Sequence, residues 1–237
     1  MLEDRLVSVL RATDVAEFRE RVLEFTKWVG FDLMSAAVVV DVPGGHTDSF
    51  YVDNAPDAYR SAFEDRGNWQ RDPVTQHCKR SGTPILWKQE TYLEHGVADK
   101  WEEQARFGYR TGIGLALHLP HGKHFMLAVD RDQSLPSSAE ERRRVAAELC
   151  LFAAYAHVAA LRLLVPQEHA DSSIQLSRRE LEVLQWTMAG KTAWEVGRIL
   201  CISEQTVTRH AVSAAQKLGC VNKVQAVAKA LRLGFLN

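Results

Sequence analysis

Short polar and cationic side chains recur at helical spacing between residues 203 and 218, and their chemistry is that of DNA recognition. Hydroxyl and amide groups can reach base edges in the major groove, while Arg and Lys can bind phosphate oxygens. The candidate DNA-binding residues are Ser203, Gln205, Thr206, Thr208, Arg209, His210 and Lys217, with Lys191 just before the preceding helix. The alternative is that they form the solvated face of a small protein-binding bundle.

Cap signals indicate the elements that must position these residues. Ser177 with Glu180, and Thr192 with Glu195, each have the spacing of a capping box, and Ser203 can cap a third helix. We expect four short helices, of which the second and third form a helix-turn-helix. The apolar positions expected to face the core are Leu181, Val183, Leu184, Met188, Trp194, Val196, Ile199, Leu200, Val207, Ala211, Ala214, Ala215, Leu218, Val224, Val227, Ala228 and Leu231.

The charge of the chain is divided unevenly along its 237 residues. From Leu176 onward there are nine Lys/Arg against four Asp/Glu, a net of +5, whereas the first 175 residues carry 20 against 26, a net of −6. A basic end favours a nucleic-acid partner. The polar stretch around Pro166 is typical of a linker. We therefore predict a domain over residues 1–165, a linker over 166–175 and a DNA-binding domain over 176–237.

Other classes of protein find little support in the sequence. It has no nucleophile paired with a base, no glycine-rich phosphate loop and no set of metal ligands, so neither an enzyme nor a cofactor is expected. The four cysteines are widely separated, which favours reduced thiols. No apolar run reaches the roughly 18 to 20 residues that cross a bilayer, and the N-terminus mixes acids with bases. We therefore expect a cytoplasmic protein that does not bind a membrane.

The first 165 residues alternate between helix-like and strand-like patterns. Amphipathic helices are expected over 13–30 and after Ser138, short helices over 56–66, 73–81 and near Trp101, and strands over 31–42, 49–54 and on both sides of 121–122. Adjacent strand pairs wrapped by helices favour an antiparallel sheet between helical layers. The expected fold class is therefore α+β, an N-terminal α/β/α sandwich with an antiparallel sheet followed by a C-terminal all-α four-helix helix-turn-helix domain.

The helix after Ser138 carries a stripe of small and apolar residues suited to close packing, either inside this domain or against a second subunit. The stripe consists of Val145, Leu149, Phe152, Ala153, Ala156, Ala160 and Leu163.

The segment "LSRRELEVLQWTMAGKTAWEVGRILCISEQTVTRHAVSAAQKLGCVNKVQAVAKALRLG" resembles the DNA-binding domain of LuxR-type regulators along its whole length. The earlier segments "DNAPDAYRSAFEDRGNWQRDPVTQHC", "PILW" and "WEEQARFGYRTGIGLALHLP" resemble the autoinducer-binding domain of the same family. The resemblance implies a quorum-sensing transcriptional regulator that responds to a small acyl signal, normally an N-acyl homoserine lactone. It also implies a homodimer on near-palindromic double-stranded DNA, with RNA polymerase as a candidate partner.

The resemblance places the ligand between the sheet and a helical layer, with an Asp accepting its amide N–H. The ligand-binding residues that it implies are Tyr59, Phe63, Asp72, Val74, Trp87, Trp101, Tyr109 and Ala128, and Gly112 falls at the glycine typical of the family. Asp72 precedes a proline and so has a second interpretation as a helix cap. Ordinary core packing is the alternative for Trp87 and Trp101.

Several positions depart from the family pattern. Tyr59 stands where a Trp usually bonds the lactone carbonyl, Phe63 and Ala55 replace tyrosines, and Ala128 replaces a hydroxyl-bearing residue. Tyr59 can still donate one hydrogen bond. We therefore expect a less polar pocket that takes an unsubstituted acyl chain or a ligand that is not a homoserine lactone. Two alternatives stay open, a ligand-independent or protein-sensing regulator of the same family and a phosphorylation-driven response regulator.

Overall fold

The computed structural model describes residues 1–41, 47–62, 71–166 and 175–236. Phe63 and most of the expected linker lie outside the described residues. The chain divides into two compact units. The first, called the sensor unit below, contains Met1–Val39, Ser49–His118 and His124–Pro166, and the second, the C-terminal unit, contains the last four helices with Val40–Asp48 and Leu119–Lys123.

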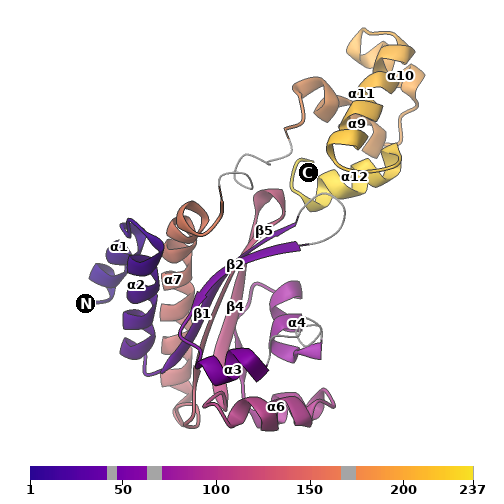
Figure 1. The fold of residues 1–237 in the computed structure, drawn as a ribbon. Helices are drawn as coiled ribbons and strands as arrows, with labels where there is room; N and C mark the ends of the chain where they lie inside the picture. Colours follow the sequence, from indigo (N-terminus) through magenta and orange to yellow (C-terminus); the bar gives the residue numbers. More distant parts are fainter. Residues whose placement is uncertain (42–46, 63–70, 167–174, 237) are drawn as a thin grey trace. The chain divides into compact units, whose positions relative to one another are not determined.

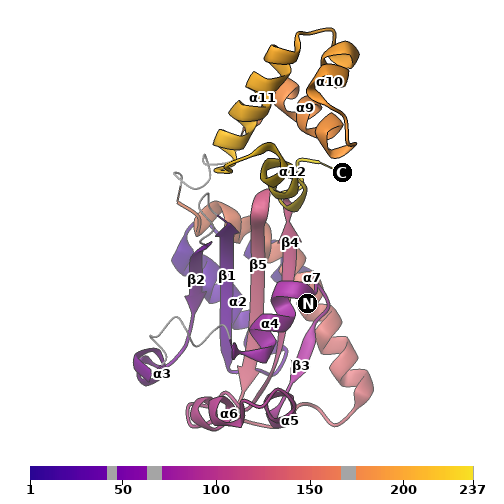
Figure 2. The same cartoon turned by 90° about the vertical axis from the view of Figure 1, so that its right-hand side faces the viewer.

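Five strands form the central sheet, in the spatial order β2-β1-β5-β4-β3 (Figure 2). The pairing of β3 with β4 is antiparallel and sets Trp87 opposite Gly112. The turn between β4 and β5 is tight, and His121 adopts a left-handed conformation there, with φ 64°. The strands are β1 (Leu33–Asp41), β2 (Thr47–Asp53), β3 (Ile85–Trp87), β4 (Thr111–Leu119) and β5 (Lys123–Arg131).

Helices α1 (Leu2–Leu10), α2 (Val15–Trp28) and α7 (Ala139–Leu163) form a layer on one face of the sheet (Figure 1). The short helices α3 (Asp57–Ala62), α4 (Pro73–Arg80), α5 (Gln89–Glu94) and α6 (Ala98–Ala105) lie on the other side (Figures 1 and 2). The α/β/α arrangement expected from the sequence is confirmed. Helix α1 was not expected, because its nine residues carry no cap side chain that signals a start.

Helix α7 is the main core helix of the sensor unit. Ser138 caps it, and the rings of Phe152 and Phe25 stack with centroids 3.8 Å apart. Except for the half-buried Leu163, the expected stripe is fully buried, so it packs inside the sensor unit. Of the described helices, α7 alone is long and apolar enough to cross a bilayer, which corrects the expectation that no segment reaches that length. Its alanine stripe instead packs within the fold, as in a globular core.

The C-terminal unit contains α9 (Arg178–Met188), α10 (Ala193–Leu200), α11 (Glu204–Lys217) and α12 (Lys223–Arg232). Both capping boxes form as expected, and Ser203 caps α11. The core-facing residues expected for α11 are all buried. The expected helix-turn-helix, made by α10 and α11, is confirmed.

Six residues of this unit that were expected in the core are instead exposed: Met188, Trp194, Ile199, Val224, Ala228 and Leu231. The buried face of α12 is formed by Ala226 and Ala230, followed by Leu233. Small alanines let α12 approach the other helices closely, and this leaves the larger residues on the outer face. Of the four residues expected on the buried side of α12, only Val227 packs against this core, so hydropathy alone largely misplaced the buried face.

Cys201 ends α10 in the left-handed conformation, with φ 55° and ψ 43°. A side chain is disfavoured there by about 1 kcal/mol because its Cβ approaches the backbone. We expect Cys201→Gly to raise the free energy of unfolding of the C-terminal unit by about 0.5 kcal/mol, after the entropy cost of glycine. Gly190→Ala is the converse control, because φ is +80° and an added Cβ would meet nothing within 4 Å. In urea denaturation, Cys201→Gly should raise the free energy of unfolding and Gly190→Ala should lower it. Equal changes in the two variants would contradict the backbone argument.

Candidate ligand-binding and DNA-binding sites

Small residues on β4 open one face of the sheet toward the short helices. A Cβ on Gly114 would lie 2.8 Å from Val74 of α4, so this face is directed at α4. A Cβ on Gly112 would lie 2.2 Å from Asp130 Oδ1 and 2.6 Å from Trp87 Nε1. Glycine at this position therefore lets the indole of β3 reach across β4 to the carboxyl of β5.

The Asp130 carboxyl is deeply buried at this contact. Burial raises the pKa of Asp130 to about 8, the hydrogen bond from Trp87 opposes this rise, and the negative charge of Asp72 adds to it. Among the described residues, no Lys or Arg forms an ion pair with Asp130. At neutral pH the carboxyl is therefore mainly protonated and can donate a hydrogen bond.

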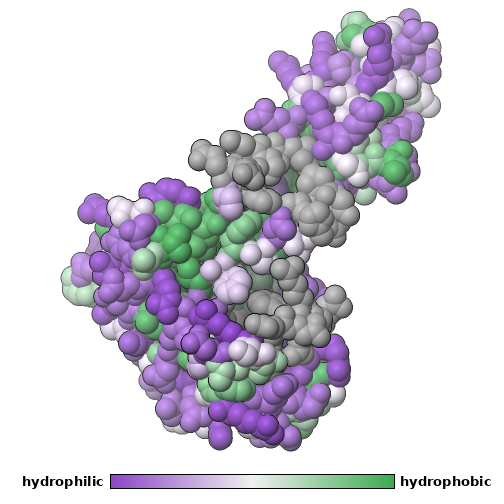
Figure 3. Space-filling view, viewed as in Figure 1, coloured by the Kyte–Doolittle hydropathy of each residue, from purple (hydrophilic) through white to green (hydrophobic). Residues whose placement is uncertain are grey.

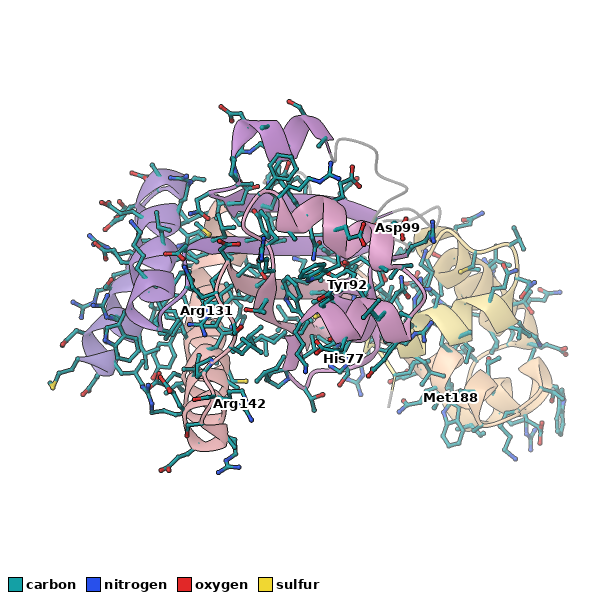
Figure 4. The ribbon with its side chains drawn as sticks, turned by 90° about the horizontal axis from the view of Figure 1, so that it is seen from below. His77, Tyr92, Asp99, Arg131, Arg142 and Met188 are labelled. Carbon is teal, nitrogen blue, oxygen red and sulfur yellow. The ribbon has the colours of Figure 1, made fainter. Side chains whose placement is uncertain are left out.

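Asp72 lies at the start of α4 and has both of its carboxylate oxygens engaged. Oδ1 accepts the backbone N–H of Thr75 at 2.7 Å, and Oδ2 accepts the Tyr92 hydroxyl at 2.9 Å. The helix-cap interpretation is therefore confirmed, while binding of a ligand stays a prediction. Figure 4 shows Tyr92 inside the sensor unit, with Asp99 near its edge. Burial raises the pKa of Tyr92, so its hydroxyl stays a donor.

The structure brings most of the predicted ligand-binding residues together. Trp87 and Tyr92 are buried in one cluster, and Val74, Trp101 and Tyr109 pack against it. The Trp101 indole N–H donates to the carbonyl oxygen of Arg110 at 2.9 Å, so its polar atom already has a protein partner.

Tyr59 joins this group through ring contacts. It stacks on Tyr109 with centroids 4.3 Å apart and meets Phe107 edge-on at 5.7 Å. Burial raises the pKa of both tyrosines, so both hydroxyls keep their protons at neutral pH. Ala128 is half-buried on β5 and is not part of the cluster, and Phe63 lies outside the described residues.

Sequence reasoning missed three polar residues near this site: Tyr92, Gln104 and Asp130. Each is more than nine-tenths buried. Asp130 could have been found from strand alternation, because it lies two residues after Ala128 and so shares its face of β5. Tyr92 and Gln104 carry no such local signal. Tyr92, Gln104 and Asp130 therefore add polar groups near the site, and none of them is at a position where the sequence departs from the family pattern.

The predicted DNA-binding residues occupy three different environments. Gln205, Thr208 and Arg209 are exposed on α11 and, with Glu204, line one surface depression. Ser203 is bonded within the cap to the half-buried Thr206, and His210 is also half-buried. The remaining two, Lys191 and Lys217, are held by carboxylates, at 3.5 Å from Glu195 and 2.8 Å from Glu180 respectively.

Glu180 of α9 is the buried centre of the helix-turn-helix unit. Its carboxylate accepts hydrogen bonds from Lys217 at 2.8 Å, Ser213 at 2.7 Å and the backbone N–H of Ser177 at 2.6 Å. Burial alone would raise its pKa, but these hydrogen bonds outweigh burial and lower the pKa to about 2. Lys217 and Ser213 therefore fix α11 on α9.

A sheet with a buried polar and aromatic cluster, in one chain with a helix-turn-helix, defines a transcriptional regulator that couples a small-molecule sensor to DNA binding. Residues 14–160 match the autoinducer binding domain, and residues 174–230 match the family described as bacterial regulatory proteins, luxR family. The chain belongs to the LuxR family of ligand-responsive, quorum-sensing transcriptional regulators, which are not enzymes.

Two relatives share much of the chain. The transcriptional activator protein SolR of Ralstonia nicotianae is 30% identical over 225 residues, covering 95% of this chain and 94% of the relative. The quorum sensing-dependent transcriptional regulator RpaR of Rhodopseudomonas palustris is 35% identical over 171 residues, covering 70% and 66%.

Solved structures share the fold. SdiA in complex with octanoyl-rac-glycerol superposes with a TM-score of 0.77 at 23% identity, covering 100% of this chain and 96% of that chain. A crystal structure of Escherichia coli SdiA gives the same TM-score at 25% identity, covering 99% and 97%.

Proposed function

We propose that this regulator acts in the cytoplasm and responds to an N-acyl homoserine lactone or a related small acyl signal. The observation that carries this proposal is Asp72, held at the start of α4 beside the aromatic cluster by Thr75 and Tyr92. A fixed carboxylate is suited to accept an amide N–H, and the aromatic walls are suited to an acyl chain. We propose that the regulator binds this signal and uses no metal or cofactor.

We assign sensing to residues 1–165 and DNA binding to residues 176–237, with residues 166–175 as the linker. Mass spectrometry of the native protein, purified from cells grown with and without added acyl homoserine lactones, tests the assignment. We expect bound lactone and a larger soluble yield, because a ligand that binds only the folded state stabilises it by mass action. Asp72→Asn keeps the helix cap but removes the charge and should retain less lactone. Equal yield and no bound lactone would contradict the proposal.

One observation favours a second candidate, a regulator of the same family that needs no lactone. Both oxygens of Asp72 already have protein partners, so the site is satisfied without a ligand. If this candidate holds, the protein purified without lactone should be soluble and bind its DNA with the same affinity as the protein purified with it. Gel-shift titrations of both preparations decide between the candidates.

We further propose that the protein works as a homodimer on a near-palindromic operator. Leu151, Tyr155 and Val158 are exposed along the outer face of α7, at a spacing that puts them on one stripe. Figure 3 shows an apolar patch over this helix. Such a patch is typical of a protein-binding surface. Sedimentation of the full chain with and without operator DNA measures the state directly.

RNA polymerase is the proposed protein partner of the C-terminal unit. Trp194 is 61% exposed, and Ile199 and Met188 are also exposed, although the sequence pattern had placed all three in the core. Large apolar side chains held at the surface of a small helical unit favour a protein contact.

Arg209 on α11 provides a direct test of DNA binding. We expect Arg209→Ala to weaken binding to a DNA fragment that the protein selects from a random pool, and to reduce the salt slope by about one unit, if its guanidinium binds a phosphate. Arg178→Ala is the matched control, because the Arg178 side chain on α9 is 92% exposed and pairs with Glu182. An unchanged slope and affinity for Arg209→Ala would remove this residue from the interface.

A further inference from the structure

Two carboxyl groups lie in the sensor unit between the sheet and the short helices, and their surroundings are opposite. Asp72 is held by a backbone N–H and a tyrosine hydroxyl, and the positive charge of Lys100 acts on it. Asp130 accepts a hydrogen bond from the Trp87 indole, and the negative charge of Asp72 acts on it. Asp72 therefore has two donors and a positive charge acting on it, whereas Asp130 has one donor and a negative charge, so burial favours the neutral acid at Asp130.

The position of Asp130 is built into the strands. Trp87 is paired with Gly112 across β3 and β4, and the missing side chain at Gly112 leaves the space that the indole and the carboxyl share. The titratable groups that interact electrostatically with Asp130 are Tyr59 on α3, Asp72 on α4, Tyr92 on α5 and Tyr109 before β4. None of these four is a cation, so none would stabilise an Asp130 anion.

A neutral acid and a carboxylate on the same side of the sheet have complementary hydrogen-bonding roles. Asp72 can only accept, so it suits an N–H of the ligand. Protonated Asp130 can donate, so it suits a carbonyl oxygen.

We propose that Asp130 is a specificity-determining residue of this sensor, which as a neutral acid donates its O–H to a carbonyl oxygen of the ligand while Asp72 accepts the ligand's N–H. This inference rests on the proposed sensing function and names the ligand class more closely, as a neutral N-acyl amide with an acceptor oxygen in its head group. Because the donor exists only while Asp130 is protonated, ligand affinity falls as the pH rises above neutrality.

The test uses the full chain with N-hexanoyl homoserine lactam, an analogue in which the ring is an amide and resists alkaline opening. Its affinity is measured by calorimetry at pH 6.5, 7.5, 8.5 and 9.5 for the wild type, Asp130→Asn and Asp130→Leu. We expect the wild type to lose at least about tenfold in affinity across this range, because apparent affinity follows the competent fraction. Asp130→Asn keeps a neutral donor of the same shape and should vary by less than about twofold.

Asp130→Leu removes the donor and should bind about tenfold more weakly than the wild type at pH 6.5. Thermal unfolding of each variant at each pH separates loss of binding from loss of fold. If Asp130→Leu does not fold, the dependence of affinity on pH in Asp130→Asn still tests the donor role of Asp130. Matching pH profiles for the wild type and Asp130→Asn would overturn the role of Asp130 alone. If the wild type binds neither this lactam nor the parent lactone at pH 6.5, the proposed sensing function itself fails.

Discussion

Replacing Gly112 by alanine is expected to disable the sensor unit. The added Cβ would lie 2.2 Å from Asp130 Oδ1 and 2.6 Å from both Trp87 Nε1 and the Val129 carbonyl oxygen. The last of these atoms is backbone and cannot move without distorting β5. Overpacking of this kind typically costs about 1 to 3 kcal/mol, and we expect the upper end of that range because two strands must shift.

Hydrogen exchange of the β4 and β5 amides in the full chain measures this loss. Gly82→Ala is the matched control, because its added Cβ would meet one atom at 3.6 Å, an ordinary contact. The control should exchange like the wild type. If Gly112→Ala also did so, the glycine would not be needed for the contact between Trp87 and Asp130.

Replacing Glu180 by alanine is expected to loosen the helix-turn-helix unit. The change leaves Lys217, Ser213 and the backbone N–H of Ser177 without their shared acceptor. Losing the acceptor of several hydrogen bonds, one of them from a charged lysine, should lower the free energy of unfolding by about 2 kcal/mol. The figure is kept low because the Lys217 side chain is 43% exposed and can bind water instead.

Glu182 lies on the same helix and gives the control. It pairs with Arg178 and Arg179 at the surface, so Glu182→Ala should lower the free energy of unfolding much less than Glu180→Ala does. Hydrogen exchange of α9 and α11 in both variants makes the comparison. Equal losses would show that the buried network adds nothing beyond a surface pair.

The hydrogen bonds to Glu180 also determine how the free energy of unfolding changes with pH. The pKa of Glu180 is lowered from its ordinary 4.5 to about 2 by its hydrogen bonds, so the folded state favours the carboxylate. The stabilisation is complete above pH 4.5 and is lost as the pH falls from 4.5 toward 2. We therefore expect the difference in unfolding free energy between the wild type and Glu180→Ala to narrow over that window. A difference that stayed constant would place the contribution of Glu180 in packing rather than charge.

Features that depend on near neighbours in the chain could be predicted from the amino-acid sequence. The caps at Ser177, Thr192 and Ser203 form as expected, because each joins a side chain to a backbone amide three residues away. The α/β/α arrangement followed from strand and helix periodicities, and the family from motifs that span the chain.

Long-range packing determines which residues are buried and which distant groups share one site, so neither could be predicted from local patterns. Trp194 is as apolar as a core residue but is exposed, whereas Ala226 and Ala230 are buried, because shape at the packed interface decides the contact. The ion pair of Lys217 with Glu180, 37 positions away, carries no local sequence signal. Asp130 and Trp87 meet across a glycine that neither adjoins in sequence. Such pairings depend on strand order and register, which long-range packing fixes and local sequence patterns do not contain.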